Sequence, residues 1–336
     1  MKIDAYSHIL PAPYFERMRQ LVANPGMFKR WLELPALHDI DVRLRMMEEF
    51  GDDYQQVLTL SSPPIEVLAT PEQSPGLARL ANESMLELCQ KYPERFPAFV
   101  ASLPMNNPDA VFEELDYAID ELGARGVQVF TNVNGKPLDE PEYLEIFERM
   151  AQRDLPVWMH PARGPGHADY LTESTSKYEI WWALGWPYET SVAMSRLVFS
   201  GILERYPDLK IITHHMGAMI PSLEGRIGLG WSDQLGSRTA EVDYAKLREE
   251  RLPLPLVDYF RRFYADTALS GSAIGVRCGL DFFGAERVLF GSDCPFDPQG
   301  GPMYIREIIR VVDELDITDA ERECVYHRNV RGLMRL

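Results

Sequence analysis

The chain has 336 residues, 46% hydrophobic and 25% charged, and this composition is typical of a globular protein with a large core rather than of a disordered chain. Its formal net charge of -17, with no local cluster of Lys and Arg, argues against a nucleic-acid partner. No apolar run approaches ~18 residues, and the 4 cysteines form no Cys-x-x-Cys pair. We therefore expect a cytoplasmic protein with free thiols, no membrane partner and no zinc finger.

Short apolar runs alternate with helix-forming segments along the whole chain. Eight of the runs predict strands, which lie near residues 3, 57, 99, 127, 157, 211, 265 and 289. Helices are expected between them, among others over about 41–50, 74–92, 109–122, 143–153 and 189–206. Eight strands alternating with helices, each apolar enough to be covered on both faces, are typical of a (β/α)8 TIM barrel. We predict one such domain over residues 1–336.

Two segments exceed ordinary loop length, at about 163–186 and 228–256. The first follows the fifth strand and is rich in aromatic residues, and the second follows the sixth strand. Long insertions after barrel strands shape either the pocket or a subunit interface, and the sequence leaves both uses open.

Metal-ligating side chains stand where the predicted strands end, which is where catalytic groups gather in a barrel. The first strand ends in His8, and strict alternation places Asp4, Tyr6 and His8 on one face. The fifth strand ends in His160 and the eighth in Asp293. Imidazole and carboxylate groups on one rim suit zinc, iron or manganese. The sequence therefore predicts a metal site at this rim.

The sixth strand ends in two adjacent histidines, His214 and His215. Because side chains alternate along a strand, we expect only one of them to face the barrel axis. We assign His214 as a metal ligand or as a group that supports one, and His215 as the group that faces the substrate. Asp293 could act as a base beside the metal instead of binding it.

Three residues near the fifth and sixth strands are candidates for binding a substrate. Arg163 is placed to neutralise a substrate carboxylate, and Trp186 lies in the aromatic segment that suits a planar ligand. Glu189 is expected to begin a helix, where a carboxylate commonly compensates the helix dipole. A surface charge is the alternative reading for Arg163, and packing in the core or at an interface is the alternative for the aromatic residues.

The chain resembles the amidohydrolase superfamily, in particular the branch of aminocarboxymuconate semialdehyde decarboxylase and the resorcylate-type decarboxylases. The resemblance covers nearly the whole chain and rests on Ile3 to Pro11, Gly126 to Gln128, Val157 to Pro161, Trp186 to Thr190, Arg196 to Gly201, His215 to Pro221 and Phe290 to Phe296. It implies a metal-dependent decarboxylase or hydrolase that acts, without oxygen or an organic cofactor, on a small carboxylated substrate. A homo-oligomer, dimer or tetramer, is a further expectation, and a hetero-oligomer is its alternative.

The resemblance also implies roles for single residues. His8, His160 and Asp293 would bind one divalent metal, with zinc as the first expectation. His215 stands where the family has its catalytic histidine, which moves a proton to or from the substrate.

The departure from the family pattern is at Tyr6, because the first strand usually ends His-x-His or Glu-x-His in relatives and here ends Tyr-x-His. A neutral phenol with a pKa of ~10 is a poor zinc ligand, so a ligand role for Tyr6 would indicate iron or manganese. Three readings follow: a decarboxylase or hydrolase; an iron- or manganese-dependent oxygenase that uses Tyr6 as an extra ligand; and a non-catalytic partner subunit.

Overall fold

A ring of parallel strands forms the centre of the molecule in the computed structural model, which describes residues 1–22, 29–238 and 242–336. The eight strands of the ring are β1 (Lys2–Ile9), β2 (Tyr54–Leu60), β3 (Ala101–Ser102), β4 (Val127–Phe130), β7 (Val157–His160), β8 (Ile211–Thr213), β9 (Tyr264–Asp266) and β10 (Val288–Leu289). Each lies at or beside a position that the sequence predicts. Two short strands, β5 (Asn132–Val133) and β6 (Lys136–Pro137), form a separate antiparallel hairpin.

Hydrogen bonds close the ring at two seams where the ladders are short. At the first seam the amide of Val100 donates to the carbonyl of Leu58 over 2.9 Å, which joins β2 to the segment before β3. At the second seam the amide of Ala5 donates to the carbonyl of Phe290 over 2.8 Å, which joins β1 to the segment after β10. Parallel pairing accounts for the other contacts in the ring. The predicted (β/α)8 barrel is therefore confirmed.

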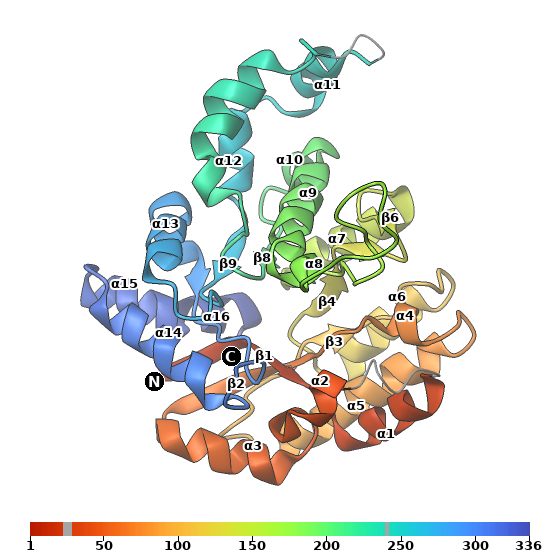
Figure 1. Cartoon of the computed structure of the whole chain (residues 1–336), viewed down its shortest axis with the longest axis vertical. Coiled ribbons are helices and arrows are strands. Elements are labelled where there is room, and N and C mark those ends of the chain that lie inside the picture. The colour runs from red at the N-terminus through yellow and green to blue at the C-terminus, as the bar shows by residue number, and fades with distance from the viewer. Residues whose placement is uncertain (23–28, 239–241) are drawn as a thin grey trace.

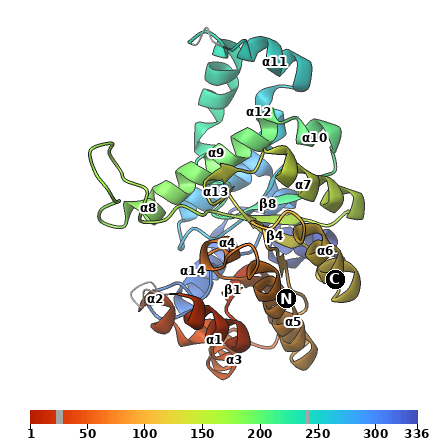
Figure 2. The same cartoon turned by 90° about the vertical axis from the view of Figure 1, so that its right-hand side faces the viewer.

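Helices surround the ring and cover its outer face (Figure 1; Figure 2). They are α1 (Ala12–Leu21), α2 (Lys29–Leu32), α3 (Ile40–Met47), α4 (Ile65–Leu68), α5 (Ser74–Lys91), α6 (Val111–Asp116), α7 (Pro141–Arg153), α8 (Ile180–Ala183), α9 (Gly185–Phe199), α10 (Ile202–Arg205), α11 (Tyr244–Arg251), α12 (Leu256–Phe260), α13 (Ala273–Phe283), α14 (Pro302–Glu314), α15 (Asp319–Glu323) and α16 (Asn329–Met334). No helix in the described ranges is long and apolar enough to cross a membrane.

The helix predicted over 189–206 differs from the structure at both its start and its interior. It begins at Gly185, so Glu189 lies in its second turn and does not start it. It also divides into α9 and α10 at Gly201, whose φ of 79° lies in the left-handed region that glycine adopts without a Cβ penalty.

The two predicted long loops are partly helical. The segment 163–186 includes α8 and the first residues of α9. The segment 228–256 includes α11, which projects away from the barrel (Figure 1), and the first residue of α12, which is buried in the core. Within it, residues 239–241 lie outside the described residues.

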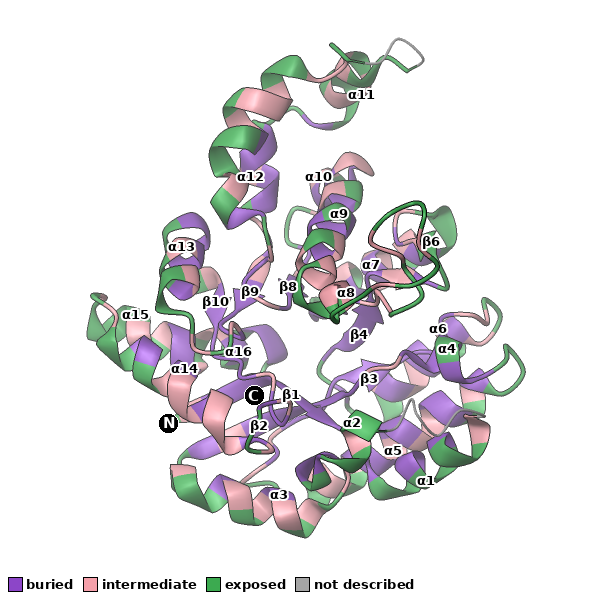
Figure 3. Cartoon of the chain, viewed as in Figure 1, coloured by how far each residue is buried: buried purple, intermediate pink, exposed green. Residues whose placement is uncertain are grey.

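Apolar side chains fill the ring from inside and pack helices against it from outside. The inner cluster includes Val57, Val100, Trp158 and Ile212, all fully buried. The indole Nε1 of Trp158 donates to the carbonyl of Ala5 on β1 over 3.0 Å and so spans the barrel interior. A larger cluster lies between the strands and the helices, and Figure 3 shows the strands as the most continuously buried part of the chain.

A β-bulge in β1 changes which of its side chains face inward. Asp4 pairs with Gln56 and His8 pairs with Thr59, with a shift of register between Asp4 and Ser7. Paired residues point to the same face, whereas Gln56 and Thr59 are an odd number of positions apart and face opposite ways. The prediction that Asp4 shares a face with Tyr6 and His8 is therefore wrong. Asp4 instead accepts a hydrogen bond from the Tyr54 hydroxyl over 2.8 Å.

Candidate metal centre

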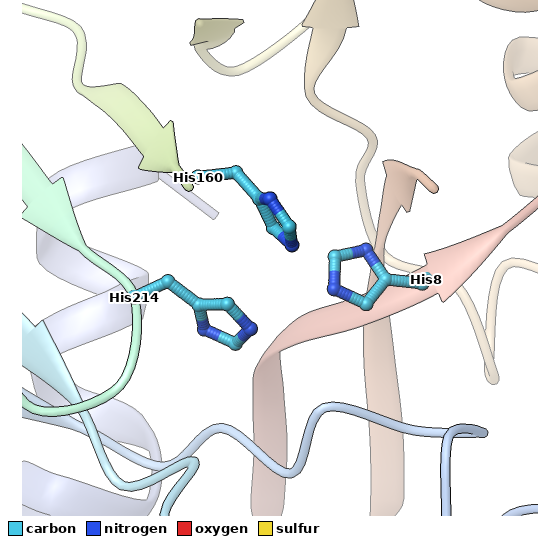
Figure 4. A group of neighbouring side chains, drawn as sticks. All are labelled: His8, His160 and His214. Carbon is cyan, nitrogen blue, oxygen red and sulfur yellow. The ribbon is translucent and has the colours of Figure 1, made fainter. Parts of the chain in front are cut away.

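Three imidazole rings from different parts of the ring of strands point toward one another (Figure 4). His8 lies near the end of β1, His160 is the last residue of β7, and His214 directly follows β8. All three are buried, and each can offer one nitrogen within 4.8 Å of a nitrogen from each of the others. This convergence occurs because parallel strands end at the same rim of a barrel.

Asp293 faces the same group from the segment after β10. Its Oδ1 lies 3.2 Å from His8 Nε2 and 3.4 Å from His214 Nε2, and its Oδ2 lies 3.8 Å from His215 Nε2. The φ of Asp293 is 63°, so the chain turns at this residue and directs the carboxylate into the barrel mouth. The predicted strand-end residues His8, His160 and Asp293 are therefore brought together.

Both adjacent histidines reach this group, although alternation along a continuing strand predicted that only one of them would face the barrel axis. Strand β8 ends at Thr213, and His215 has a φ of 59°, so the chain has left the extended conformation whose alternation the prediction assumed. The ring centroids of His214 and His215 are 3.8 Å apart. His214 is fully buried, whereas the side chain of His215 is 16% exposed to solvent.

The Nδ1 atoms of the three converging rings are engaged in hydrogen bonds. His160 Nδ1 lies 2.7 Å from the carbonyl of Pro161, His214 Nδ1 lies 2.5 Å from Asp266 Oδ2, and His8 Nδ1 lies 3.3 Å from Thr59 Oγ1. Assigned from these partners, Nδ1 carries the hydrogen in the neutral rings of His8 and His160 and Nε2 presents its lone pair, whereas a protonated His214 carries a hydrogen on both nitrogens. The Nε2 of His8 is buried and makes no well-aligned hydrogen bond to any described residue, although Asp293 Oδ1 lies 3.2 Å away. Nitrogen donors in this arrangement, beside a carboxylate, fit a divalent first-row metal.

Burial and neighbouring charges act in opposite directions within the group. Burial lowers the pKa of His8, His160 and His215, and although Asp293 acts in the opposite direction on His8 and His215, burial outweighs it and favours the neutral form that binds metal. Burial also opposes charge on His214, but Asp266 and Asp293 outweigh it and raise the pKa of His214 to about 9. Burial opposes charge on Asp293 as well, yet the facing histidines, and His214 most of all, hold its pKa well below the usual value.

Tyr6 lies inside the barrel beside this group. Its ring stacks on that of His214, with centroids 3.9 Å apart and an interplanar angle of 20°. Its hydroxyl is buried and has no hydrogen-bond partner among the described residues. Burial, together with Asp266 and Asp293, raises the pKa of Tyr6 well above that of a free phenol, so without a bound cation it is neutral. A ligand role for Tyr6 stays a prediction.

The predicted substrate residues line one side of the mouth. Trp186 lies near His160 and His215: the centroid of its ring is 5.5 Å from that of His160 and 6.1 Å from that of His215. Arg163 is half-buried beside Gly185 and forms no ion pair with any residue that the structure describes. Glu189 instead accepts hydrogen bonds from Thr131 and Asn132, so it fastens α9 to the rim.

Two residues that the sequence analysis missed hold this site in place. Asp266 ends β9 and binds the amide of His215 over 3.0 Å in addition to the ring of His214. The sequence feature that could have indicated Asp266 is a carboxylate at the end of a buried strand, the same feature that indicated Asp293. Arg43 is fully buried on α3 and donates to the carbonyl of His8 over 2.7 Å. Nothing in the helix pattern marked Arg43, because its partners are distant in sequence.

A sequence model of the amidohydrolase family matches residues 3–336. The chain belongs to this family. Gamma-resorcylate decarboxylase of Rhodococcus jostii is 33% identical over 93% of this chain and 92% of its own length. The 2-amino-3-carboxymuconate-6-semialdehyde decarboxylase of Dictyostelium discoideum is 26% identical over 96% of this chain and 88% of its own length. The resemblance to this branch of amidohydrolases is confirmed.

Among solved structures, a dihydroxybenzoic acid decarboxylase from Polaromonas sp. JS666 matches this amidohydrolase with a TM-score of 0.76 and 26% identity. The match covers 100% of this chain and 97% of that one. That structure contains bound manganese and the inhibitor 2-nitroresorcinol.

Proposed function

We propose that this amidohydrolase catalyses the metal-dependent, non-oxidative decarboxylation of a small aromatic acid that carries a hydroxyl group next to its carboxylate. The observation that carries the proposal is the convergence of buried imidazoles and Asp293 beside His215, whose side chain is 16% exposed, and next to the aromatic ring of Trp186. The full-length similarity to decarboxylases of aromatic acids supports the substrate class.

The proposed metal ligands are His8, His160 and Asp293, and a divalent cation there would supply Lewis acidity toward the substrate carboxylate and its neighbouring oxygen. We keep zinc as the sequence-based expectation and add manganese, which the relative from Polaromonas binds. Elemental analysis of the purified protein distinguishes the two metals.

His215 is the proposed proton donor. Decarboxylation adds one proton to the ring carbon that bears the carboxylate, after which the C–C bond breaks, its electron pair returns to the ring and CO2 leaves. A neutral His215 must first take up a proton, and its partial exposure allows exchange with water. Asp293, 3.8 Å away, stabilises the resulting imidazolium.

The other proposed substrate contacts come from the 163–186 segment and the start of α9. Trp186 would pack on the aromatic ring of the substrate, and Arg163, whose charge also acts on the nearby Asp169, would neutralise the substrate carboxylate. Glu189 would act indirectly by fixing the position of α9.

The decisive assay follows CO2 release from 2,6-dihydroxybenzoate and 6-methylsalicylate with and without oxygen. Oxygen-independent turnover that a chelator removes and added metal restores is the expected result. Turnover that requires oxygen would instead support the oxygenase reading, and no turnover with either acid would contradict the proposed substrate class. In the same assay Arg163→Met should raise KM roughly tenfold or more with little change in kcat. The exposed His167→Ala is a matched control from the same segment.

A homo-oligomer remains part of the proposal. Tyr170, Leu171 and Tyr178 of the 163–186 segment are 74%, 106% and 91% exposed, and exposed apolar groups of this kind are common at protein interfaces. Light scattering on a size-exclusion column measures the molar mass and tests this expectation.

A further inference from the structure

We propose that His214 is the third imidazole ligand of the metal, delivered from β8 and held in place by Asp266 and Tyr6. This inference rests on the proposed metal-dependent function and refines its ligand set, which otherwise consists of His8, His160 and Asp293.

The first support is the position of the ring. His214 offers a nitrogen within 4.8 Å of those of His8 and His160, and its Nε2 lies 3.4 Å from Asp293 Oδ1 (Figure 4). The nitrogens of His8, His160 and His214 therefore form one group, and Asp293 Oδ1 borders this group on the side of His8 and His214. Four donors of these types suffice for the tetrahedral coordination that zinc prefers and leave positions free on a larger ion.

The second support is the way in which the ring is held. Asp266 Oδ2 binds His214 Nδ1 over 2.5 Å, and Asp266 Oδ1 accepts the amides of His215 and Ala268, each over 3.0 Å. Both carboxylate oxygens are therefore engaged and Asp266 is itself fully buried. This arrangement leaves Nε2 as the only ring nitrogen of His214 directed at the other donors. A carboxylate that orients an imidazole from behind is a common feature of metal sites.

The third support is Tyr6, which stands where relatives have a second imidazole or a carboxylate on the first strand. Tyr6 occupies an inward position of β1 two residues before His8 and presents a phenol ring, which stacks on His214 at 3.9 Å. The stacking fixes the plane of the His214 ring, while Asp266 fixes its rotation. Tyr6 thus acts as a positioning residue for His214.

A different arrangement is chemically reasonable, in which His214 stays protonated between Asp266 and Asp293 and never binds the metal. The two arrangements predict opposite effects of removing the imidazole. A ligand lost from the site weakens metal binding, whereas loss of a buried positive charge beside Asp293 leaves binding of a cation unchanged or makes it tighter.

The test measures the dissociation constant for Mn²⁺ by competition with a chelator, and the visible spectrum of the Co²⁺-loaded protein, in full-length variants whose folding is checked by circular dichroism. We expect His214→Asn to weaken Mn²⁺ binding by roughly 100-fold and to change the Co²⁺ spectrum. The exposed His167→Asn should change neither. Asp266→Asn keeps the imidazole but loosens it, and should weaken binding by roughly tenfold.

A compensating substitution makes the test sharper. In the His214→Asn background, Tyr6→His places a new imidazole on the inner face of β1 and should recover at least ~10-fold of the lost affinity. Tyr6→Phe in the same background should recover none. Wild-type affinity in His214→Asn, alongside lost affinity in His160→Asn, would overturn this inference alone. Failure of the wild-type protein to bind any metal would overturn the proposed function as well.

Discussion

Two regions of the molecule bury polar groups that have no hydrogen-bond partner among the described residues, yet they differ in how those groups are arranged. At the strand ends the Nε2 of His8, which makes no well-aligned hydrogen bond, faces two other imidazoles and lies 3.2 Å from Asp293 Oδ1. Beside β2, Glu66 on α4 and Tyr14 on α1 bury an unpartnered carboxylate oxygen and an unpartnered hydroxyl, and no cation in the described part of the chain forms an ion pair with Glu66. Tyr14 belongs to an apolar cluster with Leu60 and Ile65. This difference indicates that several metal-ligating side chains must lie close together to form a candidate metal site, and that burial of a single polar atom is not enough.

The largest effect on activity should come from a substitution in the histidine cluster at the strand ends. His160→Ala removes a donor that has no substitute, and it should lower kcat/KM for decarboxylation roughly a thousandfold or more, because a bound metal supplies several kcal/mol of transition-state stabilisation. Steady-state kinetics with elemental analysis measures both activity and metal content. If His160→Ala were as active as His167→Ala, the cluster of histidines at the strand ends would not be the catalytic metal site.

The second effect separates proton transfer from metal binding within the same region. His215→Asn should lower kcat by roughly 100- to 10,000-fold, the usual contribution of a general acid, while the metal content stays that of the wild type. Metal loss in this variant would show instead that His215 is a ligand. Elemental analysis beside a single-turnover assay decides between these roles.

The comparison with Glu66 gives a prediction about pH and stability. Burial raises the pKa of Glu66 to about 7, whereas a free glutamate titrates near 4.5. Between these two pH values the folded state binds more protons than the unfolded state, so the stability that the neutral carboxyl provides is lost as pH rises from about 4.5 to about 7.

Glu66→Gln should therefore be more stable than the wild type at pH 8 and should show a smaller loss between pH 5 and pH 8, by up to about 1.4 kcal/mol for each pH unit. Urea unfolding at both pH values measures this difference. The exposed Glu87→Gln is the control. Equal losses of stability in the wild type and in Glu66→Gln would show that the Glu66 carboxylate has a partner after all.

The smallest effect is expected at Tyr14. Tyr14→Phe removes a buried hydroxyl that lacks a partner, so the free energy of unfolding should stay constant or rise by about 1 kcal/mol. The same urea experiment measures it. A loss larger than that would indicate that the hydroxyl binds an ordered water or a ligand, and the region beside β2 would then resemble the strand ends more closely.

The sequence alone determined the barrel, because eight apolar runs between amphipathic helices have few other ways to bury both faces of each strand. It also placed His8, His160 and Asp293 at one rim, since parallel strands in a closed ring end on the same side. Both results follow from periodicity and from the order of elements, which are local properties of the chain.

Only the tertiary structure decided the details of the site. The bulge in β1 turned Asp4 away from Tyr6, and the left-handed backbone at His215 brought both adjacent histidines to Asp293. Asp266 on β9 binds the ring of His214, and Arg43 on α3 binds the carbonyl of His8, so two segments distant in sequence hold the candidate ligands in place. Departures from regular backbone and contacts between distant segments set the direction of each side chain, and neither leaves a periodic signal in the sequence.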